Sequence, residues 1–500
     1  MPAKSGPEPG PGGPRPASGS LAESTIPWYK VAEPRGEDPR IQTFAGHHRG
    51  EGTMGESRMN LLYLHTHDSG RYLEAGAGPR RLANIDRLAA GGVTFRNAFS
   101  AAPTCSPSRS ALLTGYPPHS TGMTGLSHRG FRLRDYSAHI RRFCADQGMQ
   151  TVLCGVQHIA PEKSMIGYDR VLDGPTDYFH VPNLSPDQWD RENADRVARF
   201  LREDPEQPFF LSFGMLTTHR PYPPESAELP ERAWPPPPST VPDRPETRRD
   251  MERFVTGLDR VDENVGRVLD ALVETGQWDR TVVILTTDHG PPFPGMKGTL
   301  RDGGIGVSLI LRIPGLADQG GVEHALVSQI DLFPTLLELI GLDPVDHYSG
   351  DGRSLLPLLR GETGRIRDAV AAETNYHANY EPARAVRTER YKYIRHYGDA
   401  DTARPANVDD SPGKSILGAA GYFDDARPRE QLFDLLLDPM EGRNRAEERA
   451  YEEIRRELAG RLDDWMQQST DRLGDEPVPR PRGSRLNRED AWSAEEPTEE

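Results

Sequence analysis

Short apolar runs alternate with amphipathic segments through the middle of this chain. The longest amphipathic segment, residues 250–275, carries an apolar stripe at helical spacing, and Gly276 behind it suits a left-handed helix cap. Buried strands joined by amphipathic helices are typical of a mostly parallel sheet covered on both faces, so the pattern predicts an α/β fold. The apolar runs of strand length lie at residues 59–64, 151–154, 209–213 and 281–285.

The pattern changes beyond residue 356. Residues 383–396 and 431–437 are rich in side chains that favour strands, and residues 448–466 show the spacing of a final amphipathic helix. We therefore predict a main α/β domain over residues 58–365 and a smaller α+β subdomain over residues 366–470.

Both ends of the chain differ from its centre. Residues 1–20 are rich in Gly, Pro and Ser, and the following residues are polar without periodicity, so residues 1–57 are predicted to form a disordered or irregular extension. Residues 471–500 hold nine acidic residues, five arginines and few apolar side chains. This composition predicts an acidic, disordered tail.

Composition then narrows the classes of function. The 60 basic residues against 76 acidic ones give a net charge of −16, and because nucleic-acid binding needs clustered basic charge, we expect no such partner. The chain has no apolar run of the roughly 18–20 residues of a membrane span, and its first residues lack the apolar region of a signal peptide. With only three cysteines, too few for a disulfide framework, we expect a cytoplasmic protein without a membrane partner.

Polar side chains stand where two of the predicted strands end. His67 and Asp68 follow the first strand, and Asp288 and His289 follow the strand at residues 281–285. Ligands of parallel sheets bind beyond the carboxyl ends of the strands. Carboxylates suit Ca²⁺ or Mg²⁺, whereas imidazole shifts the preference toward softer ions. Loop carboxylates are also common as solvated turn residues, so these positions alone leave a metal site open.

Cys105 stands in an unusual context. It opens the segment CSPSRSALLTG, residues 105–115, where a loop enters a short helix whose N-terminus favours an anion. Arg109, one turn later, adds a guanidinium suited to a tetrahedral oxyanion. A small buried cysteine would explain neither feature, although it is the preferred interpretation of Cys144 and Cys154.

This segment resembles the C-x-P-S-R…L-T-G signature of the formylglycine-dependent sulfatases, in the alkaline phosphatase superfamily. The resemblance covers residues 58–465 and is greatest to the sulfamidase, or heparan N-sulfatase, group. It implies an alkaline-phosphatase-like, mostly parallel sheet flanked by helices, and hydrolysis of a sulfate ester or N-sulfate of a sugar. Further blocks in family order are residues 83–99, 218–221, 287–290, 297–304, 331–336, 384–393 and 432–439.

The resemblance also implies catalytic roles. Cys105 would be oxidised to formylglycine by a formylglycine-generating enzyme, a transient partner, and the hydrate would supply one hydroxyl to attack sulfur and a second to expel sulfate. Arg109 would steady the hydrate and the anion, and His158 would hydrogen-bond the hydrate. Lys297 would contact sulfate, and His219 would protonate the leaving group.

By the same resemblance, a divalent metal would lie beside Cys105 and neutralise sulfate charge. The implied ligands are Asp68, Asp288 and His289, with His67 in the same cradle. Ca²⁺ is the expected ion, with Mg²⁺ and Mn²⁺ as alternatives. His377 is a candidate for substrate contact.

Two departures from the family pattern keep other readings open. His67 stands where the family usually has a second acid, and Val156 stands where it has a lysine near the sulfate, a role that Arg129, Arg132 or Arg170 could fill. The main hypothesis is a sulfatase that acts on the end of a small sulfated substrate. The alternatives are a phosphodiesterase or phosphonate monoester hydrolase of the same superfamily, and a degenerate, non-catalytic relative.

Overall fold

The structure, a computed structural model, describes residues 59–174, 185–227, 229–398 and 401–499. The chain divides into two compact units, residues 1–50 and 51–500, and every described residue belongs to the second. The extension predicted over residues 1–57 lies outside the described residues.

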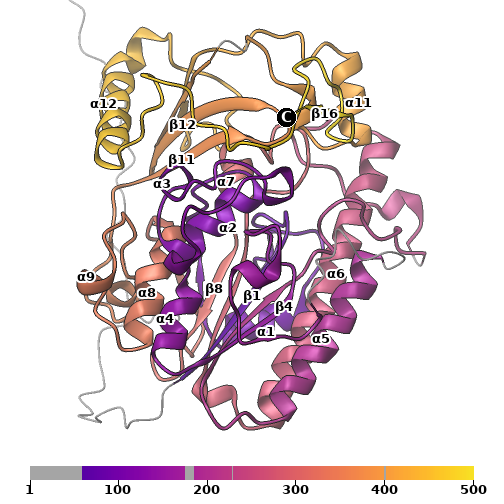
Figure 1. The fold of residues 1–500 in the computed structure, drawn as a ribbon. Coiled ribbons are helices and arrows are strands. Elements are labelled where there is room, and N and C mark those ends of the chain that lie inside the picture. The colour runs from indigo at the N-terminus through magenta and orange to yellow at the C-terminus, as the bar shows by residue number, and fades with distance from the viewer. Residues whose placement is uncertain (1–58, 175–184, 228, 399–400, 500) are drawn as a thin grey trace, which may run out of the picture. The chain divides into compact units, whose positions relative to one another are not determined.

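An eight-stranded sheet forms the centre of the described chain (Figure 1). Its four central strands, β4, β6, β1 and β7, run parallel, whereas β8 lies antiparallel to β7 and to β2. The predicted mostly parallel sheet is confirmed. In spatial order the strands are β5 (Arg170–Val171), β4 (Gln150–Gly155), β6 (Phe209–Gly214), β1 (Asn60–Thr66), β7 (Thr281–Thr287), β8 (Leu309–Arg312), β2 (Val93–Phe95) and β9 (Gly321–Glu323).

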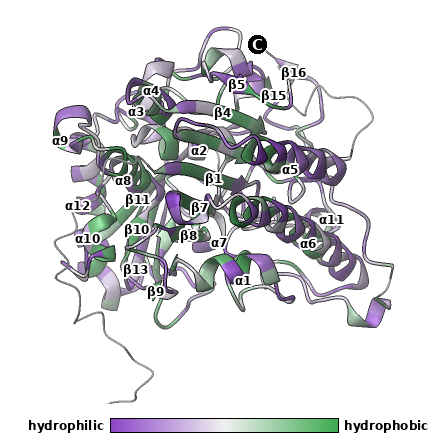
Figure 2. Cartoon of the chain, turned by 90° about the horizontal axis from the view of Figure 1, so that it is seen from below, coloured by the Kyte–Doolittle hydropathy of each residue, from purple (hydrophilic) through white to green (hydrophobic). Residues whose placement is uncertain are grey.

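Helices cover both faces of this sheet, which is why its central strands read as continuous apolar runs. Leu62 and Leu64 of β1 share a core with α1 (Ala83–Ala90), α5 (Pro186–Arg202) and α6 (Pro245–Glu274). Leu61 and Tyr63 point the other way, because side chains alternate along a strand, and share a second core with α2 (Cys105–Thr114), α4 (Ile140–Asp146) and α8 (Leu332–Leu339). Figure 2 shows α5 and α6 on one side of the strands and α8 on the other.

The long predicted helix is α6, which begins about five residues earlier than the apolar stripe indicated. Pro245 occupies its first turn, where the missing N–H costs nothing. The helix ends at Glu274, and Gly276 adopts the expected left-handed conformation just beyond it.

A second sheet is antiparallel, in the order β11 (Ala369–Tyr376), β12 (Tyr380–Thr388), β13 (Tyr391–His396) and β14 (Glu430–Asp434). The last helix, α12 (Glu452–Gln468), packs Leu458, Leu462 and Met466 onto it. The α+β character predicted for this region is therefore confirmed, while the domain boundaries stay a prediction.

The remaining elements are short. They are β3 (Ala98–Phe99), α3 (Pro118–Thr121), α7 (Asp302–Ile305), β10 (Val327–Ser328), α9 (Pro344–His347), α10 (Leu356–Leu359), α11 (Pro412–Ala419), β15 (Leu486–Asn487) and β16 (Thr498–Glu499), with 3₁₀ turns at Ser127–Arg129, Tyr136–Ala138, Lys163–Met165, Glu231–Ala233, Trp278–Arg280, Gln329–Asp331, Pro405–Asn407 and Arg449–Tyr451. In the described part of the chain, none of the helices combines the length and the apolar character that crossing a bilayer requires. The cytoplasmic location stays a prediction.

Residues 471–499 pack against the second sheet, which differs from the disordered tail that composition predicts. Leu473, Val478 and Ala491 are buried, and Val478 exchanges two hydrogen bonds with the hydroxyls of Tyr376 and Tyr380. Composition averages over the segment, whereas a few well-placed apolar side chains and backbone hydrogen bonds hold it in place.

A buried ionic cluster joins helix α3, the second sheet and the tail. His119 of α3 donates from its backbone N–H and from Nδ1 to Glu373 of β11, and Nε2 lies 3.1 Å from the carbonyl of Ser469. Arg384 of β12, which is fully buried, donates to both carboxylate oxygens of Asp471. Both ring nitrogens of His119 thus face acceptors, which suits a charged imidazolium.

Charge pairing dominates the electrostatics of this cluster. Burial alone would raise the pKa of Glu373, but His119 and Arg384 lower it to about 2. Burial alone would lower the pKa of His119, but Glu373 and then Asp471 raise it above its usual value. The network therefore stays ionised in the folded protein.

Replacing Glu373 with Gln should destabilise the fold, because two cationic partners lose a buried carboxylate. We expect the free energy of unfolding to fall by about 3–5 kcal/mol near neutral pH, measured by urea denaturation. Glu452→Gln is the control, since Glu452 pairs with Arg456 on the exposed surface of α12, and there the expected change is about 0–1 kcal/mol.

The loss of stability in Glu373→Gln should also depend on pH. The folded pKa of Glu373 is depressed, so its contribution is present above the unfolded pKa of about 4.3 and is lost as the pH falls toward 2. The stability difference between the protein and Glu373→Gln should shrink across that interval. A difference that stayed constant would show that the carboxylate charge does not contribute.

Candidate active site

Two carboxylates meet where β1 and β7 end. The strands pair in parallel register through Thr66 and Thr287, so the residues that follow them lie side by side. The backbone N–H of Asp68 donates to Oδ1 of Asp288 over 2.8 Å, and both carboxylates are buried. Asp68 adopts a left-handed backbone conformation (φ 51°), which is uncommon outside glycine and is enriched at functional sites.

Close backbone approach shapes this edge of the sheet. A Cβ on Gly155 would lie 2.1 Å from the carbonyl oxygen of Gly214, and one on Gly290 would lie 1.8 Å from that of Gly303. Only glycine fits at either position. At these two positions the neighbouring backbones therefore touch directly, with no side chain between them.

Helix α2 carries Cys105 in its first turn and Arg109 one turn later. Arg109 is buried, and its Nη2 donates to Oδ2 of Asp288 over 2.9 Å and to the carbonyl of Thr66 over 2.8 Å. Its Nη1 donates to Nδ1 of His65. The predicted guanidinium thus lies at the centre of the site, where it neutralises one of the two carboxylates.

The Cys105 thiol faces the same cluster. Its Sγ lies 3.3 Å from Nε2 of His289 and 3.9 Å from Oδ1 of Asp68. Burial raises the pKa of this thiol well above its usual value, and the neighbouring carboxylates act in the same direction. A neutral thiol is a poor nucleophile.

His289 is oriented as a ligand. Its Nδ1 donates to the carbonyl of Gly290 over 2.9 Å, which leaves Nε2 with its lone pair 3.2 Å from Oδ1 of Asp68 and 3.6 Å from Oδ2 of Asp288. A hydrogen bond at the second ring nitrogen is the usual way to fix the tautomer of a metal-binding histidine.

His67 is fully buried beside both carboxylates. Its Nδ1 lies 3.2 Å from Oδ2 of Asp288 and 3.6 Å from Oδ1 of Asp68. Among the described residues neither ring nitrogen has a hydrogen-bond partner. Burial and the charge of Arg109 lower the pKa of His67 to about 3, so the ring is neutral.

A cation fits this group. His67, Asp68, Asp288 and Cys105 each offer one ligand atom, all within 4.8 Å of one another. Orphaned buried nitrogens next to paired carboxylates are the arrangement that a divalent ion satisfies. Burial would raise the pKa of both carboxyls, but Lys297 for Asp68, and His289 with Arg109 for Asp288, hold both pKa values below the usual range.

Lys297 and His219 complete the cluster on its second side. Nζ of Lys297 lies 2.8 Å from Oδ2 of Asp68. His219 donates from Nδ1 to the carbonyl of Arg220 over 2.6 Å, and its Nε2 lies 4.0 Å from Oδ2 of Asp68. With a side-chain exposure of 21 %, His219 is more open to solvent than Asp68 or Lys297.

His158 follows β4 and also reaches the cluster. It lies within ligand distance of both His67 and Cys105. Its Nε2 is 2.9 Å from Nδ1 of His128, and the two rings stack with centroids 5.2 Å apart. Burial lowers the pKa of His158, and the charge that His128 would carry acts in the same direction.

Two members of the site were missed in the sequence. Asp409 lies 3.2 Å from Nζ of Lys297, although 112 residues separate them. His128 belongs to no recognisable motif. The one available signal is the acidic pair at Asp409 and Asp410, just before the helix α11.

His377, the candidate for substrate contact, is buried close to Lys297 and Asp409. Burial and then the charge of Lys297 lower its pKa to about 3. Its loop is tied to the Asp409 loop, because Oδ1 of Asn407 accepts hydrogen bonds from the N–H groups of Ala378 and Asn379.

Val156 and the candidate replacement arginines make their contacts outside the carboxylate cluster, and Arg132 is exposed. Val156 packs with Trp189 and Leu216 in a small apolar cluster. Arg170 forms an exposed ion pair with Glu203, and Arg129 donates to Asn487 and Ala494. Among the described residues, the lysines and arginines in contact with the carboxylate cluster are therefore Arg109 and Lys297.

Comparisons with known proteins agree with this geometry. The Sulfatase family model matches residues 60–342, more than half of the chain, and the model named N-sulphoglucosamine sulphohydrolase, C-terminal, matches residues 297–414. An ulvan-active sulfatase of Formosa agariphila is 27 % identical over 463 residues, covering 82 % of this chain and 75 % of that protein. Human N-sulphoglucosamine sulphohydrolase is 28 % identical over 469 residues, covering 82 % and 90 %.

Solved structures show the same fold. A structure described as a 2-O GAG sulfatase superposes with a TM-score of 0.66 at 22 % identity, covering 88 % of this chain and 99 % of the other. At this identity the likeness concerns the arrangement of the two sheets.

Replacing His67 with Asp should favour Ca²⁺. The variant adds a hard anionic ligand, so we expect Ca²⁺ to bind at least about tenfold more tightly, measured by calorimetry. Without metal, a third buried carboxylate should lower the melting temperature, and Ca²⁺ should raise it more than in the parent. Exposed His347 provides the control, as His347→Asp. Equal Ca²⁺ affinity in parent and His67→Asp would remove His67 from the ligand set.

Replacing Asp409 with Asn should strengthen anion binding, because the carboxylate competes with a bound anion for Lys297. In a Cys105→Ala background we expect sulfate to bind several-fold more tightly, measured by calorimetry. Asp410→Asn is the matched control, since Asp410 pairs with Lys414. Weaker sulfate binding in Asp409→Asn would mean that Asp409 positions Lys297 for the anion.

Proposed function

Because this chain belongs to the sulfatase family, and is thereby a hydrolase of sulfate esters or N-sulfates, we propose that it removes sulfate from the end of a small sulfated sugar through formylglycine at position 105. The observation that carries the proposal is the position of Cys105 at the start of α2. There the side chain touches His289, and Arg109 and Lys297 supply the cations of the same cluster.

The hydrogen bonds of Arg109 are evidence for a modified residue at position 105. Its Nη1 and Nη2 are occupied by His65, Thr66 and Asp288, while its Nε is buried without an acceptor among the described residues. An oxygen on residue 105, or on a bound sulfate, would satisfy that donor. When formed, the formylglycine hydrate supplies one hydroxyl for attack on sulfur and a second that allows sulfate to leave.

A divalent cation fits beside it. Asp68, Asp288 and His289 would hold the ion, and His67 would take the place of a further carboxylate. We propose Ca²⁺, with Mg²⁺ and Mn²⁺ as the other outcomes of a metal analysis. Such an ion lowers the pKa of a neighbouring hydroxyl and offsets the charge of sulfate.

The remaining residues of the chain handle charge and protons. Lys297, neutralised in part by Asp68 and Asp409, would contact a sulfate oxygen as a point charge. His219 is held by Arg220 so that Nε2 faces the cluster, where it would give a proton to the leaving oxygen or nitrogen. His158 would hydrogen-bond the hydroxyls of residue 105.

A modifying enzyme would have to act early. Cys105 is 2 % exposed, and all ten residues of α2 are buried. A formylglycine-generating enzyme would therefore meet this segment before the chain has folded, as a transient partner.

The proposal that the substrate is a sugar rests on the names of the relatives. Human N-sulphoglucosamine sulphohydrolase is named for an N-sulfated sugar, and the Formosa agariphila relative is named an ulvan-active sulfatase. A carboxylate at Asp409 beside Lys297 suits a substrate with a single anionic group at this point.

The decisive measurement is mass spectrometry of the peptide that contains Cys105, from protein made in a host with formylglycine-generating activity. We expect residue 105 to have lost its sulfur, while Cys144 and Cys154, both buried, keep theirs. Sulfur retained in full at Cys105 would sink the proposed mechanism.

Kinetics then separate the enzyme classes. We expect an aryl sulfate to be hydrolysed much faster than an aryl phosphodiester, and Cys105→Ala to lose at least about a thousandfold in kcat. The reverse preference would favour the phosphodiesterase alternative. Absence of both activities in the modified, metal-loaded protein would favour the degenerate one.

A further inference from the structure

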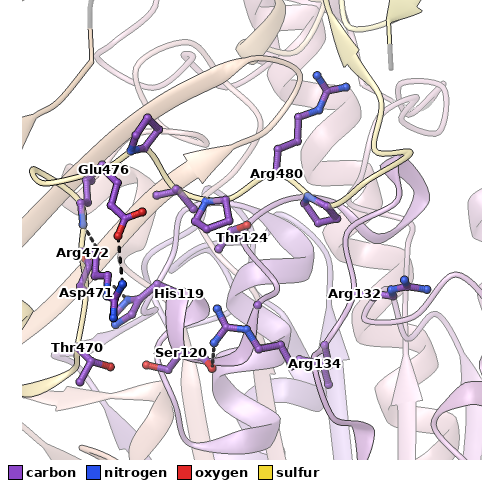
Figure 3. A pocket seen from close by; sticks show the side chains of 17 residues that line it. His119, Ser120, Thr124, Arg132, Arg134, Thr470, Asp471, Arg472, Glu476 and Arg480 are labelled. Carbon is purple, nitrogen blue, oxygen red and sulfur yellow. Dashed lines mark hydrogen bonds and ion pairs between the residues drawn. The ribbon is translucent and has the colours of Figure 1, made fainter.

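A cavity opens between residues 119–134 and the tail, apart from the Cys105 cluster. It has a volume of about 930 Å³, and residues 470–481 form its other wall (Figure 3). These tail residues lie beyond both family matches, which end at residues 342 and 414. The cavity is thus made in part by a segment that the family resemblance does not cover.

Arginines dominate the lining of this cavity. Arg472 is neutralised by Glu476 over 3.1 Å, and Asp471 by Arg384. Among the described residues Arg132, Arg134 and Arg480 have no carboxylate partner: Arg134 donates to the carbonyl of Ser120, and Arg480 to the hydroxyl of Ser484 and the carbonyl of Glu499. Figure 3 shows these three guanidinium groups, Arg132 and Arg134 from one wall and Arg480 from the other.

The local charge therefore opposes that of the whole molecule. The chain carries a net charge of −16, yet three exposed arginines without a carboxylate partner among the described residues line this cavity. Guanidinium forks pair with the planar edge of carboxylates and with two oxygens of sulfate. Such a concentration of arginines on an acidic protein marks a site for an anion.

The rest of the lining suits a sugar. Ser120, Thr124 and Thr470 add hydroxyl groups, and Pro477, Pro479 and Pro481 add rigid apolar surface. Because proline restricts the backbone, this wall loses little conformational entropy when a ligand binds. Hydroxyl groups, apolar ring surface and guanidinium groups together match an acidic saccharide better than an inorganic ion.

One loop joins this cavity to the Cys105 site. The segment that carries Arg132 and Arg134 also carries His128, which lies 2.9 Å from His158 of the active site. The tail reaches the same place, since Arg485 donates to the carbonyl of His128 over 2.8 Å. The two segments that wall the cavity therefore both continue to His128, which lies beside His158.

We propose that the arginine cavity, lined by Arg132, Arg134 and Arg480, binds a sulfate or carboxylate group of a second sugar unit in an anionic oligosaccharide whose terminal sulfated unit occupies the Cys105 site. The proposal rests on the proposed function and extends it from one sugar unit to a chain. The tail is then a part of the substrate-binding surface.

Binding can be measured without turnover in a Cys105→Ala background. The probe is a size-defined, fully sulfated heparin hexasaccharide, titrated by calorimetry. Arg132→Ala, Arg134→Ala and Arg480→Ala, combined in one variant, should weaken binding by at least about tenfold and reduce its dependence on salt. The control removes three arginines from the surface of α6, each paired with a carboxylate, by Arg249→Ala, Arg260→Ala and Arg267→Ala.

Kinetics of the modified enzyme provide a second measurement. The cavity variant should raise KM for the hexasaccharide and leave kcat, and the KM for a small aryl sulfate, unchanged. Equal hexasaccharide affinity in the cavity and control variants would overturn the proposal, as would an equal loss with both substrates. If titration with sodium sulfate alone shows the full difference between the variants, the cavity is a site for free anions and the saccharide proposal is wrong.

The proposed function and the cavity proposal are tested by different measurements. A Cys105 peptide that keeps its sulfur would refute the formylglycine mechanism, whereas the binding difference between the two triple variants is measured in protein that lacks Cys105 altogether.

Discussion

The arrangement of this protein depends on two carboxylates that are buried next to each other. The parallel register of β1 and β7 places Asp68 and Asp288 within one hydrogen bond, and charges removed from water are costly unless they are paired. Arg109 and Lys297 each approach one carboxylate closely. Helix α2 brings Arg109 to the carboxylates, and the segment that follows β7 brings Lys297.

The second sheet belongs to the same electrostatic arrangement. Asp409, from a loop that follows β13, faces Lys297, and Asn407 on that loop holds the backbone beside His377. The buried cluster of His119, Glu373, Arg384 and Asp471 fastens this sheet and the tail to α3, the helix that follows α2. A loop of the second sheet thus places a carboxylate beside Lys297, one of the two cations of the cluster.

Local patterns carried the prediction of the core and of the motif residues. Continuous apolar runs identified the central strands, because a strand that is buried on both faces has no exposed position that would carry a polar side chain. Cys105, Arg109, Asp288 and His289 each stand in a short motif. Asp409 and His128 do not, since they reach the site only through contacts with segments far away in the sequence. The prediction of a disordered tail was wrong for a related reason. The few apolar residues of the tail are buried against segments far away in the sequence, which its own composition does not show.

The glycine contacts at the strand ends are independent of the side chains that the site presents. Gly155 and Gly290 let neighbouring backbones touch where no side chain fits, so these two contacts do not depend on the side chains that the site presents. His67 and Val156, both fully buried, lie near these contacts without forming them, so the edge of the sheet can present a different side chain at either position on the same main-chain contacts.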